Sequence, residues 1–113
     1  MDEIQIAKVY SKAILEITVE SNAIDSLESE IKDTVELFTK DEQIWNFIVS
    51  PRIDRQIKSE IVEKATKGLV SQTLSSFLRV LIKNDRMFCL PEIYKQFYKG
   101  IDHHDQYQNF KIK

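Results

Sequence analysis

The chain is poor in the residues that turn a backbone sharply: its 113 residues include only two glycines and two prolines. Tight turns and left-handed backbone positions depend largely on glycine, so a meander of short strands is disfavoured. Helices joined by polar elbows need few such residues. The composition therefore favours an all-α fold, and 113 residues are enough for one domain with its own core.

Disulfides, excess positive charge and long apolar runs are absent as well. The single cysteine, Cys89, excludes an internal disulfide and favours a reducing compartment. Sixteen basic and eighteen acidic residues give a net charge of −2, which argues against nucleic-acid binding through bulk charge. Residues 1–10 are acidic at the start and lack the apolar stretch of a secretory signal. No apolar run is long enough to span a bilayer, so we expect no direct membrane insertion.

Helical periodicity predicts a six-helix bundle with short connections. In each helix an apolar side chain recurs every three or four residues, as a single packing face requires. The predicted helices cover residues 2–20, 23–39, 42–49, 54–67, 71–83 and 91–100. Asp41 and Asp54 are expected at helix N-caps, Gly68 is expected at a C-cap, and Ser21-Asn22 is expected to end the first helix and cap the second.

The bundle is expected to occupy residues 1–101 as one domain. The polar run Asp102–Asp105 then predicts a linker, and Phe110–Lys113 alternates like the start of a strand. With no partner strand in the sequence, residues 102–113 are expected to be a polar linker and the beginning of a missing C-terminal domain.

Two predicted helices carry apolar residues beyond what one packing face needs. A stripe of about 100° is sufficient for packing. The apolar arc of the first helix approaches half of its surface and contains Ile6, Val9, Tyr10, Ala13, Ile14 and Ile17. In the fifth helix, Val80 points away from the face formed by Leu74, Phe77, Leu78, Leu81 and Ile82. Either the chain's own helices cover these residues, or two free edges form a shallow groove for an amphipathic helix from another protein. In the fourth helix, by contrast, Ile57, Ile61, Val62 and Ala65 are expected to form an ordinary inner face.

Residues arranged for catalysis are hard to find. Gly68 and Gly100 stand alone, so no phosphate-binding loop is present, and no nucleophile motif occurs. Cys89 is expected to be buried and inert. The two histidines lie in Asp102–Asp105, where adjacent side chains of a helix point about 100° apart and do not converge on one ion. We therefore expect no catalytic residue, no cofactor and no metal site.

Three segments, in order along the chain, resemble the delta subunit of bacterial F-type ATP synthase, which is similar to the mitochondrial oligomycin-sensitivity-conferral protein. Ala7–Ile17 is similar to the opening helix of that family and matches at Ala7, Tyr10, Ala13 and Glu16. Trp45–Ile53 resembles its F-L-x-S-P-x-I segment. Ser75–Phe97 resembles its N-F-L-x-x-L-x-x-N-x-R-L-x-x-L-x-x-I-x-x-x-F segment, matching at Phe77, Leu78, Leu81, Asn84, Arg86, Leu90, Ile93 and Phe97. The sequence departs from the family pattern at Asp85, where glycine is common, and at Met87, where leucine is common.

The resemblance implies a function for the two free helix edges. In that family the N-terminal domain binds the N-terminal helix of an alpha subunit in a groove between its first and fifth helices. One wall would be Ile6, Tyr10, Ala13 and Ile17, and the other would be Thr73, Phe77, Val80 and Asn84. The subunit would be a non-catalytic stator that links the catalytic hexamer to the peripheral stalk during proton-driven ATP synthesis. The b subunit of the stalk would bind through the missing C-terminal domain, and the complex would lie at the cytoplasmic face of a bacterial cell membrane.

Two other functions are compatible with the residues. One is an unrelated helical adaptor that binds a different amphipathic helix. The other is an RNA-binding helical domain, which the mild acidity disfavours and which steep salt-dependent binding would support. An enzyme would need a site that the sequence does not reveal.

Overall fold

The structure is a computed structural model that describes the backbone of residues 2–112 and the side chains of residues 2–101. Its elements are α1 (Glu3–Glu20), α2 (Ile24–Thr39), α3 (Glu42–Val49), α4 (Arg55–Thr66), α5 (Gln72–Lys83), the 3₁₀ turn η1 (Met87–Cys89) and α6 (Leu90–Ile112). No strand occurs within residues 2–112. The prediction of an all-α, six-helix fold is therefore confirmed.

The connections between helices use capping residues that the sequence mostly reveals. Asp41 and Asp54 accept hydrogen bonds from the first free backbone N–H groups of α3 and α4, as predicted. Gly68 follows α4 with φ +82°, a left-handed conformation that suits glycine. The predicted cap of α2 is wrong, because Ala23 takes that position without a side-chain hydrogen bond. Asn22 instead adopts φ 57° and turns the chain after α1.

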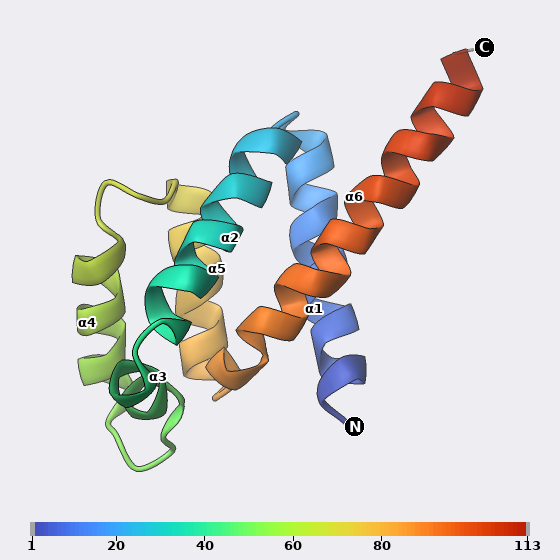
Figure 1. The fold of residues 1–113 in the computed structure, drawn as a ribbon. Coiled ribbons are helices and arrows are strands. Elements are labelled where there is room, and N and C mark those ends of the chain that lie inside the picture. The colour runs from blue at the N-terminus through green and yellow to red at the C-terminus, as the bar shows by residue number, and fades with distance from the viewer. Residues whose placement is uncertain (1, 113) are drawn as a thin grey trace.

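Helix α6 crosses α1 and also packs against α2, while α4 packs on α5 at the other side of the bundle (Figure 1). Between these helices lies one continuous core. Its fully buried large side chains are Phe38, Phe97, Ile14, Ile31, Ile48, Leu74, Leu78, Leu81, Leu90 and Ile93. At the crossing of α6 and α1, a Cβ atom on Gly100 would lie 2.7 Å from Leu15 Cδ2. A residue larger than glycine at position 100 would therefore require the Leu15 side chain to move.

The predicted inner face of α4 is largely wrong. Three of its members are exposed: Ile57, Ile61 and Ala65. The buried residues of α4 are Lys58, Val62 and Thr66. Burial of the two polar side chains is possible because each has a partner: Lys58 Nζ donates to the Ser50 carbonyl at 2.8 Å, and Thr66 Oγ1 donates to the Val62 carbonyl at 2.8 Å.

The C-terminal prediction is also wrong in its secondary structure. Helix α6 continues from Leu90 to Ile112, so it does not end at Gly100 and no strand begins at Phe110. Residues 102–112 contain neither proline nor glycine, and nothing in their backbone chemistry interrupts a helix. The side chains of the predicted linker, including Asp102–Asp105, lie outside the described residues. A domain boundary at residue 101 stays a prediction.

Candidate functional site

The side chain of Tyr10, on α1, contacts two residues, one in α5 and one at its C-cap. Its ring packs edge-on against Phe77, with ring centroids 6.3 Å apart and planes at 74°. Its hydroxyl oxygen accepts a hydrogen bond from Asn84 Nδ2 at 3.0 Å. Three of the eight residues predicted to form a partner-binding surface therefore contact one another across two helices that are far apart in the sequence.

The other predicted residues flank this contact, and most of them are open to solvent. Ile17 is 47% exposed and Val80 is 45% exposed. Ala13 and Thr73 are exposed as well, while Tyr10 and Phe77 are half-buried. We call the group the α1–α5 surface and define it as Tyr10, Ala13, Ile17, Thr73, Phe77, Val80 and Asn84. These side chains leave apolar area uncovered on both helices.

Ile6 differs from the other predicted residues. It is only 9% exposed and belongs to the core. We therefore do not expect it to contact a partner directly. Val9, which is 57% exposed on α1, belongs to the apolar arc that the sequence indicates but is not one of the predicted groove residues. At 100° per residue it lies next to Ala13, so it extends the apolar area of α1 away from α5.

The two helices of this surface run in opposite directions. Tyr10, in the N-terminal half of α1, contacts Asn84 at the C-cap of α5. Helix α1 also packs against η1, which follows α5 after the turn of residues 84–86. In Figure 1 the N-terminus of α1 accordingly lies at the same end of the bundle as the turn between α5 and α6. Ile17 and the last turn of α1 therefore lie toward the N-terminal end of α5.

A second apolar surface lies between α3 and α4. It surrounds a cavity of about 330 Å³ lined by Leu37, Phe38, Gln43, Ile44, Phe47, Ile48, Ile61 and Ala65. We call it the α3–α4 surface and define its exposed apolar members as Ile44, Ile61 and Ala65 from the cavity lining, together with Ile57, which lies one turn before Ile61 on the same face of α4. The sequence did not reveal it, because residues 57, 61 and 65 recur every four positions and resemble a core stripe.

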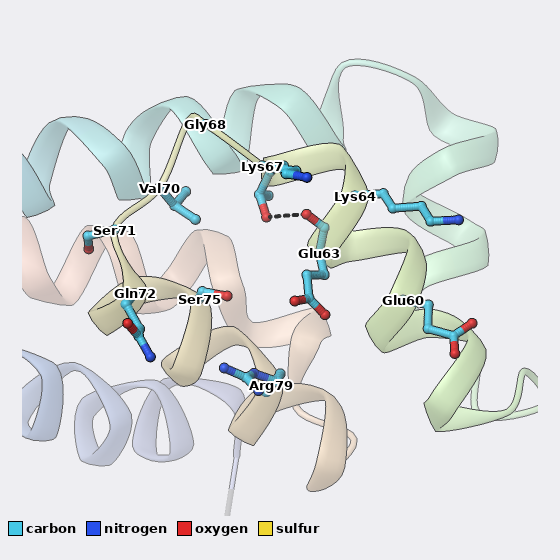
Figure 2. A pocket seen from close by; sticks show the side chains of 11 residues that line it. Glu60, Glu63, Lys64, Lys67, Gly68, Val70, Ser71, Gln72, Ser75 and Arg79 are labelled. Atoms are coloured by element: carbon cyan, nitrogen blue, oxygen red, sulfur yellow. Dashed lines mark hydrogen bonds between the residues drawn. The ribbon is translucent and has the colours of Figure 1, made fainter.

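A polar hollow of about 490 Å³ lies between the end of α4 and the start of α5 (Figure 2). Its lining carries charges of both signs, from Glu60, Glu63, Lys64, Lys67 and Arg79. Among the described residues no buried side-chain nitrogen or oxygen lacks a hydrogen-bond partner. All five of these charged residues are exposed, so water can solvate their side chains.

The titratable groups of the described residues do not form a recognisable catalytic or metal-binding arrangement. Burial raises the pKa of the Cys89 thiol to about 11, so this cysteine stays protonated and unreactive near neutral pH. Arg55 donates to the carboxylate of Asp85, and this hydrogen bond lowers the pKa of that carboxyl. Within residues 2–101 no three His, Cys, Asp or Glu side chains are placed to hold a metal ion. None of the described helices is long and apolar enough to cross a membrane.

The described residues form a small all-α bundle that leaves apolar side chains of several helices uncovered, a feature common at surfaces that contact other proteins. The chain belongs to the ATP synthase delta (OSCP) subunit family, whose family model matches residues 6–113.

Relatives agree with this assignment. ATP synthase subunit delta of Leptospira biflexa is 31% identical over 98 residues, which cover 87% of this chain and 52% of the relative. The subunit delta of Leptospira interrogans is 34% identical over 102 residues, covering 90% and 53%. That of Lachnoclostridium phytofermentans is 28% identical over 99 residues, covering 88% and 54%. The chain thus spans about half the length of the curated relatives it matches.

Proposed function

We propose that this chain is a binding domain of a non-catalytic ATP synthase subunit and that its α1–α5 surface binds the N-terminal helix of an alpha subunit. The observation that carries the proposal is the contact of Tyr10 with Phe77 and Asn84, at 6.3 Å between ring centroids and 3.0 Å between Asn84 Nδ2 and the hydroxyl. This contact links two helices that each carry exposed apolar side chains, among them Ile17 and Val80. Membership of the delta family supports the choice of partner.

The composition of the surface suits an incoming amphipathic helix. Ile17 and Val80 each keep nearly half of their side-chain area in water, and a helix that covers them would be stabilised by about 1 kcal/mol for each. Ala13 is small and exposed, so a partner backbone can approach α1 closely at this position. The hydrogen bond from Asn84 holds the Tyr10 ring in place before binding, which lowers the entropy lost when the ring becomes part of an interface.

A stator function needs tight binding with slow dissociation and no chemistry. The catalytic hexamer must not turn with the rotor while proton flow drives ATP synthesis, and a delta subunit would tie it to the peripheral stalk. Contact with the b subunit of the stalk would lie outside the residues described, in the domain that the sequence resemblance places after this one. The assembled complex would lie at the cytoplasmic face of a bacterial cell membrane.

A titration of the chain with a synthetic peptide of the alpha-subunit N-terminus, followed by calorimetry, tests the proposal. We expect one-to-one binding that Val80→Asp weakens by about 2 kcal/mol, roughly thirtyfold, because a charge would be buried beneath the partner. Ala13→Trp should block the approach sterically.

Ile61→Asp is the matched control, since Ile61 is 40% exposed on α4, away from the α1–α5 surface. It should leave the affinity unchanged. Absence of binding by the unmodified chain, or equal losses in Val80→Asp and Ile61→Asp with both variants folded by circular dichroism, would exclude the α1–α5 surface as the binding site.

A further inference from the structure

The cavity between α3 and α4 lies where two helices that follow one another in the sequence pack on different neighbours. Helix α3 packs on α2 and η1, whereas α4 packs on α5. Figure 1 shows both short helices at the same side of the bundle. The space between them is the cavity of about 330 Å³. Its deepest members, Phe38 and Ile48, are fully buried, while Ile44 and Ile61 at its mouth are exposed.

The lining of this cavity is uncharged and almost entirely apolar. Of the eight lining residues only Gln43 is polar, and two others, Phe38 and Phe47, are aromatic. The hollow of Figure 2 is different, because its lining carries five charged side chains that water solvates. Water in the α3–α4 cavity finds few hydrogen-bond partners on the walls. Its displacement by an apolar molecule is therefore favourable.

The two helices that form the walls are held in place without a ligand. Lys58, near the start of α4, donates from Nζ to the carbonyl of Ser50 at 2.8 Å, and Ser50 is the C-cap of α3. Asp54, in the turn between the helices, caps α4 by accepting from Gln56 N–H at 2.8 Å. These bonds fix the end of one wall relative to the start of the other. A ligand would thus enter a preformed site and would lose little free energy in ordering it.

We propose that the α3–α4 cavity is a binding site for a small neutral molecule with a flat apolar body and one hydrogen-bonding group. The volume sets the size of the ligand, because small-molecule sites span about 300–1,000 Å³ and this cavity is at the lower end. The lining sets the chemistry. No lining residue carries a charge that could pair with a charged ligand, and the amide of Gln43 can donate to or accept from one polar group.

A titration with 2-naphthol, which is neutral near pH 7 and has one hydroxyl on a flat ring system, tests the site. We expect saturable shifts of the methyl NMR signals of Ile44, Ile61 and Ala65, with a dissociation constant of about 0.1–1 mM. The methyl signals of Ile17 and Val80, on the α1–α5 surface, should not move. The anion 2-naphthoate has the same ring system and should bind at least about tenfold more weakly, because its charge would lose water without gaining a partner.

Two variants with matched controls assign the binding to the cavity. Ala65→Phe places a ring in the cavity and should weaken 2-naphthol binding at least about tenfold, whereas Val9→Phe adds the same ring at an exposed position of α1 and should leave it unchanged. Gln43→Leu removes the polar group at an exposed position and should weaken binding about fivefold. Its control is Gln72→Leu, at an exposed glutamine of the polar hollow.

Three results would overturn the proposed site. They are the absence of saturable shifts at the three methyl groups, equal affinities for 2-naphthol and 2-naphthoate, and unchanged binding of 2-naphthol by both Ala65→Phe and Gln43→Leu. The cavity shares no residue with the α1–α5 surface. Failure of the alpha-subunit peptide to bind would therefore exclude the proposed function and not this site, and the reverse holds for 2-naphthol.

Discussion

The α1–α5 surface and the α3–α4 surface expose similar apolar side chains but are built differently. Ile17 and Val80 in the first are 47% and 45% exposed, and Ile44 and Ile57 in the second are 45% and 49% exposed. The first surface has an aromatic ring fixed by a hydrogen bond and a border of charged residues. The second surrounds a cavity whose lining has one polar side chain, Gln43. The exposed apolar area is therefore alike in the two surfaces, and the fixed aromatic contact distinguishes the α1–α5 surface, for which we propose a partner.

The largest expected effect tests whether Ile17 is free of the core. Ile14→Ala should lower the free energy of unfolding by about 2–5 kcal/mol, a range typical of a fully buried isoleucine. Ile17→Ala, one turn further along α1, should lower it by no more than about 1 kcal/mol. Urea denaturation followed by circular dichroism measures both. Equal losses would mean that Ile17 supports the core, and the contrast between the two surfaces would then be lost.

A smaller effect is expected for the hydroxyl of Tyr10. Tyr10→Phe keeps the ring but removes the acceptor for Asn84, so the ring is less well fixed before binding. We expect the affinity for the alpha-subunit peptide to fall by about 1 kcal/mol, roughly fivefold, with little change in stability. Tyr98→Phe, at a tyrosine that is 53% exposed on α6, is the control in the same titration. An unchanged affinity in Tyr10→Phe would show that the hydrogen bond does not distinguish this surface from the α3–α4 surface.

The smallest effect concerns the ion pair of Arg55 with Asp85, which links the start of α4 to the elbow after α5. Because the pKa of Asp85 is lowered in the folded state, the pair stabilises the fold at neutral pH. This contribution is lost as the pH falls through the folded-state pKa, below the ordinary carboxyl range. Asp85→Asn should lower the melting temperature slightly at pH 7 and leave it unchanged at a pH well below that folded-state pKa. Asparagine tolerates the φ of 54° at this position, so the variant removes the charge and one of the two hydrogen bonds from Arg55 without straining the backbone.

Asp33→Asn, at an exposed carboxylate of α2, is the control for Asp85→Asn. A difference between Asp85→Asn and the unmodified chain that persists in strong acid would assign the effect to the backbone and not to the ion pair.

Much of this fold could be predicted from the sequence, because each helix shows regular periodicity and the connections contain clear capping residues. Asp41 and Asp54 have the predicted N-cap positions, whereas the C-cap of α4 is Lys67 and Gly68 follows it in the turn. The free edge of α5 could be predicted because Val80 stands outside a complete apolar face. Its proximity to Tyr10 required the resemblance to a known family, since periodicity within a helix does not indicate which helices are neighbours.

The errors have physical causes. On α4, Lys58 and Thr66 are buried because backbone carbonyls satisfy them, and a polarity pattern assigns such residues to the outside. The α3–α4 surface was missed for the same reason, since the isoleucines turned outward were counted as core. The strand expected at Phe110–Lys113 rested on four residues, too short a segment to distinguish alternation from a helix that continues.

Gly100 lies where α6 contacts the Leu15 side chain of α1. At this point a methyl group would displace the Leu15 side chain, and twelve further residues of the helix lie beyond it, up to Ile112. At 1.5 Å per residue they form an arm about 18 Å long. A side chain at position 100 that separates α6 from α1 by a few tenths of an ångström would tilt residues 101–112 and displace the end of α6 by a larger distance. A residue larger than glycine at position 100 would therefore change either the conformation of Leu15 or the direction of the last three turns of α6.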